Sequence, residues 1–399
     1  MKRAFKYKLK PTMKQQKILC QFFGSARFIY NWGLNKKIST YKESKKSIGY
    51  IELAKQLTEL KKQKETLWLN ECANECLQQS LRNLDNAYTR FFKEKKGFPK
   101  FKTKKHSKDV CKFINSVKFD FNQWKVKIPK IGWTKLCLNR TFDLSKVKLG
   151  TLTVSRDNIG QYWCIIIVED GESLPPKTNV REDTTIGIDL GIKEFAILSD
   201  GTKFPNPKYY EKTQRRLATL QRVHARKQKG SKRREKARLA LAKCQKRIAN
   251  QRMDMLHKLT TYLVKDYDTI CLEDLNISGM LKNPKLAKSI QSVSWSEFRR
   301  LLEYKCDWKG KNLLLIGRFE PSSKMCHVCG YIKSDLTLKD RKWECPVCKR
   351  VHDRDVNAAI NIRDFGLHPQ NKRYEKIPPQ VSGEEDVEGR GYKPYETSK

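Results

Sequence analysis

The sequence predicts a multi-domain α+β protein in which a helical region, a β-rich region and an α/β region follow one another along 399 residues. Apolar residues recur at helical spacing through residues 13–94. Short alternating segments bounded by Gly, Asn and Asp fill residues 111–170, as in antiparallel strands. Two later apolar strands, at residues 184–190 and 269–277, contain acidic residues within their apolar runs. A chain of this length can bury the cores of two or more domains.

The charge of the chain predicts a polyanionic partner. Lysine and arginine number 84 against 43 acidic residues, a formal net charge of +41. Self-repulsion on this scale opposes a compact fold unless a polyanion neutralises it, and nucleic acid does so through its phosphates. A membrane surface is the alternative, but we find no long apolar segment and no basic amphipathic terminal helix, so we expect no membrane partner.

Residues 1–10 alternate between apolar and cationic side chains and predict a strand. Thr12 can cap the helix that follows at residues 13–41, which Gly24 is expected to interrupt or to divide in two. A polar cluster comes just after this glycine. Packing on a neighbour is one interpretation of the cluster, and contact with phosphates and bases is the other. Its members are Arg27, Tyr30 and Asn31.

Residues 51–68 and 71–94 predict two further helices. Gln79 lies on the polar side of the second, where a glutamine can pair with a base edge, although a solvated face is the commoner explanation. The loop at residues 93–108 interleaves cations, including Lys102, with two phenylalanines, which suits phosphate neutralisation and base stacking. Residues 111–170 and the first strand predict a small antiparallel barrel or sandwich.

A linker at residues 171–183 leads to the strand that holds Asp189. Strand side chains alternate between faces, so Asp189 shares a face with Gly187 and Gly191. These small neighbours leave space for a bulky charged group, and a buried acid needs such a partner. A turn-capping role is the alternative for Asp189.

Residues 208–266 predict one or two long basic helices, because 17 lysines and arginines face 2 glutamates between residues 208 and 252. Residues 230–232 should separate two antiparallel arms. This single-signed surface indicates a polyphosphate partner or, alternatively, a nuclear localisation signal. The candidate phosphate contacts are Arg215, Arg222, Arg226 and Arg233.

Four of the 13 cysteines form two Cys-x-x-Cys pairs, and the others are scattered. This spacing predicts a zinc ribbon whose four thiolates close the shell of one structural Zn²⁺, and it favours a reducing compartment over a disulfide framework. The ligands would be Cys326, Cys329, Cys345 and Cys348.

Further acidic residues lie in the C-terminal half of the chain. Glu273 lies in the strand at 269–277, with Asp274 pointing to its other face, and Asp353 and Asp355 precede a helix rich in small residues. Either of the last two could be a helix N-cap. A strand Asp, a later strand Glu and a helix-start Asp are typical of an RNase H-like fold, in which clustered carboxylates bind two Mg²⁺ ions roughly 4 Å apart.

These residues resemble the transposon-encoded TnpB family, relatives of the compact type V CRISPR effectors. The resemblance covers about residues 1–366, and its most specific motifs are the acid and cysteine motifs of the C-terminal half. The matching segments are YKLKPT, GSARFIYN, LQQSLRNLDNAYTRFF, IGIDLGIKEFA, CLEDLNISGM, PSSKMCHVCG, CPVC and DRDVNAAINI.

The resemblance implies an RNA-guided DNA endonuclease that cuts double-stranded DNA beside a short target-adjacent motif. By motif match, Asp189, Glu273 and Asp355 would be the catalytic carboxylates and Mg²⁺ ligands, with Asp353 a neighbour. The partners would be an omega-type guide RNA and target DNA, bound by a protein monomer in the cytoplasm at the nucleoid. A catalytically idle regulator, a transposase and a type V CRISPR effector are the alternatives.

The resemblance also implies a division into domains. A β-barrel wedge domain would take residues 1–10 and 111–180, around a helical recognition domain at residues 11–110. A RuvC-like nuclease domain would take residues 184–320 and 350–366, split by the zinc ribbon at 321–349. The tail from 367 to 399 is expected to be disordered.

Overall fold

The computed structural model describes residues 1–114, 116–137, 141–337 and 339–369. The chain forms two compact units, and each is described by itself. One contains residues 1–173 and 217–246, and the other contains residues 174–216 and those from 247 onward. The two long basic helices contribute residues to both units, with residues 226–231 between them. They are α4 (Tyr209–Ala225) and α5 (Lys232–Asp266).

The first unit begins with a strand and three α-helices. Thr12 caps the first helix in a capping box with Gln15. Gly24 lies inside this helix and does not interrupt it, contrary to expectation, because apolar residues before and after it pack into the same core and outweigh the cost of one helical glycine, about 1 kcal/mol. The helices are α1 (Met13–Ser44), α2 (Tyr50–Leu60), a 3₁₀-helix (Lys64–Glu71) and α3 (Asn74–Glu94).

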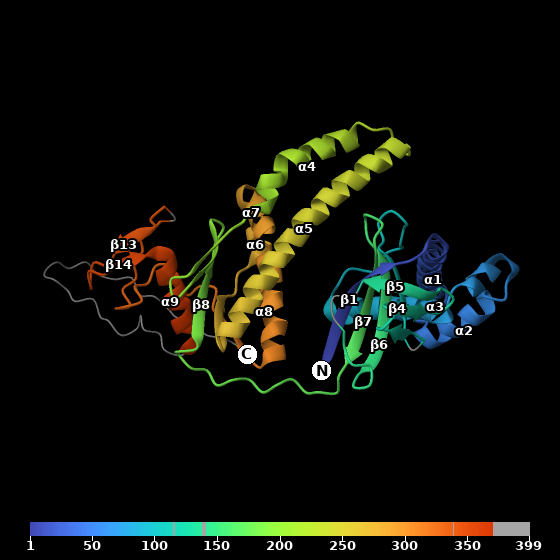
Figure 1. Ribbon diagram of the computed structural model, residues 1–399, viewed down its shortest axis with the longest axis horizontal. Helices are drawn as coiled ribbons and strands as arrows, with labels where there is room; N and C mark the ends of the chain where they lie inside the picture. The colour runs from blue at the N-terminus through green and yellow to red at the C-terminus, as the bar shows by residue number, and fades with distance from the viewer. Residues whose placement is uncertain (115, 138–140, 338, 370–399) are drawn as a thin grey trace. The chain divides into compact units, whose positions relative to one another are not determined.

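Seven antiparallel strands form one sheet in this unit, in the order β2-β6-β7-β1-β5-β4-β3. The N-terminal strand β1 joins this sheet, as expected, and it lies between β7 and β5 (Figure 1). In the described residues β2 and β3 are the edges, so the strands form neither a two-sheet sandwich nor a hydrogen-bonded closed barrel. The strands are β1 (Lys2–Lys10), β2 (Asp109–Phe113), β3 (Lys118–Asp120), β4 (Lys125–Ile128), β5 (Gly132–Cys137), β6 (Lys148–Arg156) and β7 (Tyr162–Glu169).

The core of the first unit lies between this sheet and the helices. Tyr7 and Leu9 of β1 are buried with Phe22 of α1 and Leu81 of α3 in one cluster. Alternate strand residues thus supply the apolar face that the sequence pattern predicted.

The second unit is built on a five-stranded sheet in the order β10-β9-β8-β11-β12. Strands β8, β11 and β12 are parallel, and β9 runs antiparallel to β8. Parallel strands are usually covered by helices on both faces, which explains their continuous apolar runs. The strands are β8 (Thr185–Leu190), β9 (Glu194–Leu198), β10 (Lys203–Pro205), β11 (Thr269–Glu273) and β12 (Asn312–Ile316).

Helices cover both faces of this sheet (Figure 1). Ile188 of β8 packs in one cluster with Leu259 of α5 and Phe298 of α8. On the opposite face, Cys271 of β11 packs with Ile362 of α9. The remaining helices of this unit are α6 (Ile277–Met280), α7 (Pro284–Val293), α8 (Trp295–Lys309) and α9 (Arg354–Leu367).

A small hairpin of β13 (Lys342–Glu344) and β14 (Val351–Asp353) precedes α9 directly. Of the predicted tail, residues 370–399 lie outside the described residues. Among the helices that the structure describes, none is long and apolar enough to cross a membrane.

Candidate functional site

Two of the predicted acids lie at matching positions on neighbouring strands of the sheet. Ile188 of β8 pairs in parallel register with Leu272 of β11, so Asp189 and Glu273 come next on neighbouring strands. Both therefore lie at the carboxyl ends of parallel strands, the edge at which open α/β sheets bind ligands. They also share the face that α9 covers, because Ile186 and Ile188 pack into the core of the opposite face.

The third acid, Asp355, lies in the first turn of α9. This helix presses onto β8 at Gly187, where a Cβ atom added to the glycine would lie 2.0 Å from the carbonyl oxygen of Ala359. The space that the glycine leaves is thus filled by a helix backbone, whereas the sequence suggested a charged partner there. Glycine at this point lets α9 approach closely enough to bring its first turn to the strand ends.

The pKa of Asp189 is shifted by its burial and by the charges of neighbouring residues. Burial raises the pKa of Asp189 to about 7, and the negative charges of Glu273 and Asp355 contribute to the rise. The positive charge of Arg354 opposes the shift. Because like charges disfavour one another's ionised forms, these contributions mean that Glu273 and Asp355 each lie within electrostatic reach of Asp189.

Protein groups hold the other two acids. The Ser322 hydroxyl donates to Glu273 Oε1 at 2.5 Å. Arg341 Nη1 lies 3.1 Å from Asp355 Oδ2, so a cation bound at Asp355 would share that carboxylate with a guanidinium. The three acids do not belong to a group of ligand atoms that all lie within 4.8 Å of one another; among the described residues, four cysteines form such a group.

The neighbouring acids have other partners. Asp353 is the N-cap of α9, accepting from the backbone N–H groups of Asp355 and Val356, and its carboxylate pairs with Lys203 at 2.6 Å. The N-cap alternative is therefore confirmed for Asp353. Asp274 pairs instead with Arg299 and Arg318, each at 2.7 Å.

The four predicted zinc ligands converge. Cys326 Sγ lies 3.7 Å from Cys348 Sγ, and Cys329 Sγ lies 3.5 Å from Cys345 Sγ. Tetrahedral sulfurs at the usual Zn–S distance of about 2.3 Å would be about 3.8 Å apart. The arrangement fits one four-coordinate zinc ion with no open position.

One histidine beside this cluster was missed from the sequence. His352 is buried, and its Nε2 atom lies 3.1 Å from Cys326 Sγ. Its ring also lies 4.8 Å from that of Trp343, centroid to centroid. A nitrogen at this distance can donate to a thiolate and orient a metal ligand without binding the metal itself.

The predicted nucleic-acid contacts near the N-terminus have partners within the protein. The Asn31 side chain accepts from Lys102 N at 2.7 Å and donates to Lys102 O at 2.8 Å. Tyr30 is buried, with Lys102 Nζ 3.5 Å from its ring centroid, and Arg27 pairs with Asp109 at 3.4 Å. The structure favours the packing interpretation for Asn31 and Tyr30.

Lys102 nevertheless lies close to other positively charged side chains. Burial lowers the pKa of Lys102 to about 8, and the charges of Lys112 and Arg27 contribute to the fall. A phosphate group would relieve this repulsion. Gln79 is half-buried on α3, and its role as a base contact stays a prediction.

An exposed aromatic cluster adjoins the loop that holds Lys102. The Phe92 ring, 72% exposed at the end of α3, lies 5.0 Å from the Phe91 ring. Phe98 of the loop lies 5.4 Å from Phe91 and 5.5 Å from Tyr88, centroid to centroid. Exposed rings beside lysines are suited to stacking against bases.

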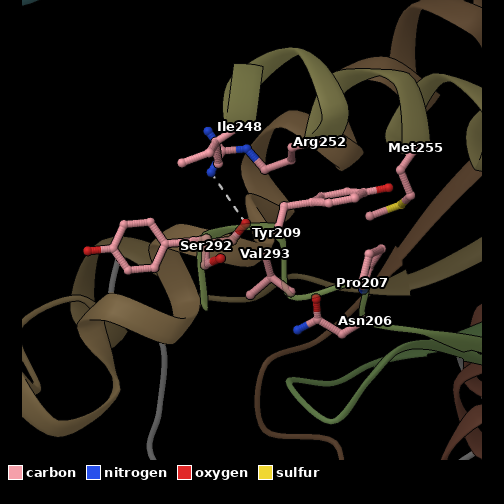
Figure 2. A pocket seen from close by; sticks show the side chains of 9 residues that line it. Asn206, Pro207, Tyr209, Ile248, Arg252, Met255, Ser292 and Val293 are labelled. Carbon is pink, nitrogen blue, oxygen red and sulfur yellow. Dashed lines mark hydrogen bonds between the residues drawn. The ribbon is translucent and has the colours of Figure 1, made fainter. Parts of the chain in front are cut away.

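The basic run separates into two arms as predicted, and some of its cations bind within the protein. Lys246 pairs with Asp157 at 2.5 Å, and Arg238 pairs with Glu235 at 2.6 Å. Arg252 donates to the carbonyl oxygen of Ser292 at 3.3 Å beside a cavity of about 10 Å³, which is about the room that one water molecule needs (Figure 2). The candidate phosphate contacts have exposed side chains. They are Arg215, Arg222, Arg226 and Arg233.

Comparison with solved structures defines the class of fold. The chain superposes on Cas12f1, from a structure described as the Cas12f1-sgRNA-target DNA complex, with a TM-score of 0.54 and 13% identity over 91% of this chain and 98% of that one. At this identity the likeness concerns the fold alone. The chain has the α+β fold of a compact effector of this kind.

Three family models match successive parts of the chain. A helix-turn-helix domain model matches residues 1–46, a model described as a probable transposase (OrfB_IS605) matches residues 166–284, and the Cas12f1-like TNB domain model matches residues 295–362. Together they cover both the acid-bearing strands and the cysteine ribbon.

Two curated relatives match almost the whole chain. A "Putative RNA-guided DNA endonuclease" of Streptomyces pristinaespiralis is 39% identical over 92% of this chain and 90% of its own length. The "Putative RNA-guided DNA endonuclease InsQ" of Escherichia coli K12 is 34% identical over 91% and 92%. The chain belongs to the TnpB family of RNA-guided endonuclease-like proteins.

Proposed function

We propose that this protein is an RNA-guided DNA endonuclease, associated with a transposon, that cuts double-stranded DNA beside a short target-adjacent motif. Asp189, Glu273 and Asp355 carry the reaction in a RuvC-like domain. The observation that carries the proposal is the parallel register of β8 and β11, in which Asp189 and Glu273 directly follow the paired residues Ile188 and Leu272. Strand ends and a helix start thus gather negative charge at one sheet edge.

The donor set fits divalent magnesium. All three side chains offer hard carboxylate oxygens, which Mg²⁺ prefers to softer ligands, and their mutual repulsion favours bound cations. If bound by these carboxylates, two Mg²⁺ ions would supply an activated water and charge stabilisation for the leaving oxygen of the phosphodiester. Ser322 and Arg341 hold the other two carboxylates.

The four cysteines hold a structural zinc ion. Sulfur separations of 3.5 and 3.7 Å support this assignment, and four thiolates leave no site for substrate or water. Zinc therefore contributes to folding of the ribbon at residues 321–349 and takes no part in the cleavage chemistry.

The surfaces that bind nucleic acid are formed by residues other than the three catalytic acids. Exposed arginines of the α4–α5 segment neutralise phosphates of the guide or of the displaced strand. The helical region at 11–110 and the seven-stranded sheet hold the guide and the duplex, with the exposed aromatic cluster at Phe92 as a stacking surface. One protein monomer binds one guide RNA in the cytoplasm.

Sequencing the RNA that co-purifies with the protein tests the guide directly. A recurrent RNA with a variable end is the expected result, and changing that end should redirect double-strand breaks to a matching plasmid in Mg²⁺ but not in EDTA. Guide-independent joining of donor ends would indicate a transposase. Guide binding without breaks would indicate a catalytically idle regulator. A guide that derives from a repeat array would indicate a CRISPR effector.

A further inference from the structure

Glu273 is held by a serine from a distant part of the chain. The Ser322 hydroxyl donates to Glu273 Oε1 at 2.5 Å across 49 residues of sequence. Ser322 is only 4% exposed, whereas the adjacent Ser323 is partly exposed. A hydrogen bond to a charged carboxylate at a partly buried site stabilises more than an exposed neutral one, so this contact is suited to fixing the Glu273 side chain.

Helix α9 holds this serine in place. Asn361 Nδ2 donates to the carbonyl oxygens of Ser322 and Met325, both at 2.7 Å, and Asn361 is fully buried. One turn earlier, Asn357 Nδ2 also donates to Met325 O at 2.7 Å. The helix that begins with the third acid therefore binds the loop that binds the second acid.

The same loop leads directly into the first zinc knuckle. Met325 precedes Cys326, and Asn357 Oδ1 accepts from the backbone N–H of His327 at 3.1 Å. The serine, two asparagines and the knuckle thus form one continuous hydrogen-bonded connection between the cysteine cluster and Glu273.

We propose that Ser322 is a positioning residue for the metal site, which sets the orientation of the Glu273 carboxylate and is itself fixed by Asn361. This inference rests on the proposed magnesium site. It assigns to the ribbon a second task, because the loop that begins the zinc site also orients a metal-binding acid. Removing a side chain that hydrogen-bonds to a metal ligand typically lowers metal affinity by about 10- to 100-fold.

Titration of the zinc-loaded, full-length protein with Mn²⁺, followed by electron paramagnetic resonance of the free ion, tests this role. Ser322→Ala should weaken Mn²⁺ binding by about 10- to 100-fold while zinc content and melting temperature stay at wild-type values. Ser322→Thr keeps the hydroxyl and should recover most of the affinity. Ser323→Ala removes the neighbouring hydroxyl and should bind Mn²⁺ as the wild type does.

The outcomes separate this inference from the proposed function. Wild-type Mn²⁺ affinity in Ser322→Ala, or an equal loss in Ser323→Ala, would overturn the positioning role and leave the magnesium site standing. If Ser322→Ala lowers the zinc content, the melting temperature and the Mn²⁺ affinity together, and Ser322→Thr restores none of them, the residue has only a structural role. Failure of the wild type to bind Mn²⁺ would remove the metal site itself, and the positioning role with it.

Discussion

Gly187 of β8 lies so close to Ala359 of α9 that a Cβ atom on the glycine would be 2.0 Å from the alanine carbonyl oxygen. The backbone nitrogen of Arg363 would lie only 2.6 Å away. Both obstacles are backbone atoms, which no side-chain rotation can remove. The contact sets how closely the helix that carries Asp355 approaches the strand that carries Asp189.

Gly187→Ala should therefore displace α9 and lower both stability and cleavage. Overpacking of this kind costs about 1–3 kcal/mol in the free energy of unfolding, measured by denaturant titration. Gly24→Ala is the matched control, because nothing lies within 4 Å of its added Cβ inside α1. The control should gain about 0.5–1 kcal/mol. Equal stability of the two variants would contradict this account of the helix contact.

Loss of a zinc ligand should disrupt the ribbon and the acid group together. Cys326→Ala leaves three thiolates, and because structural zinc supplies folding free energy, both zinc content and nuclease activity should fall. Elemental analysis and a cleavage assay measure the two. Cys20→Ala, an exposed cysteine far from the cluster in sequence, is the control and should change neither. A Cys326→Ala protein that lacks zinc yet cuts normally would refute the coupling.

Binding of nucleic acid should weaken steeply with salt. Replacing Arg222, Arg226 and Arg233 by glutamine removes exposed charges, so the slope of log K against log salt should become shallower by about 0.7–0.9 for each phosphate that is no longer neutralised. Fluorescence anisotropy with a labelled RNA at several KCl concentrations gives the slope. Lys62→Gln should leave it unchanged, since Lys62 pairs with Glu59 at 2.8 Å. A flat salt response in the wild type would contradict the phosphate surface.

Lys102 should take up a proton when nucleic acid binds. Its pKa of about 8 lies below the ordinary value of 10.5, so the folded protein binds fewer protons than the unfolded chain between these values, and its stability should rise with pH through that window. A nearby phosphate favours the charged form. Calorimetry at about pH 8.5 in buffers of different ionisation enthalpy should detect the uptake. Lys102→Met should abolish it, whereas Lys104→Met should not; uptake that survives in Lys102→Met would refute the assignment.

The sequence predicted the elements whose signals are local or strictly spaced. The acids at 189 and 273 stand out because each interrupts an apolar strand, and the cysteine pairs have the spacing of zinc knuckles. The helix predicted from periodicity at residues 71–94 matches α3, which begins three residues later, at Asn74, and ends at Glu94 as predicted.

Contacts between residues far apart in the chain could not be predicted from the sequence pattern. Asn31 binds the backbone of Lys102 across 71 residues, and its sequence neighbourhood also allowed a nucleic-acid contact. Arg341 and Ser322 hold acids that lie 14 and 49 residues away, on loops with no periodic pattern. Their roles depend on how α9 and the ribbon pack, which local propensity does not determine.

Cleavage by two matched aspartate variants tests the central claim most directly. Asp189→Ala should abolish guide-dependent cutting of matched double-stranded DNA in Mg²⁺ while guide RNA still binds. Asp274→Ala should keep cutting, because Asp274 pairs with Arg299 and Arg318 instead of joining the acid group. Cutting by Asp189→Ala at the wild-type rate would contradict the claim that these three carboxylates form the nuclease centre.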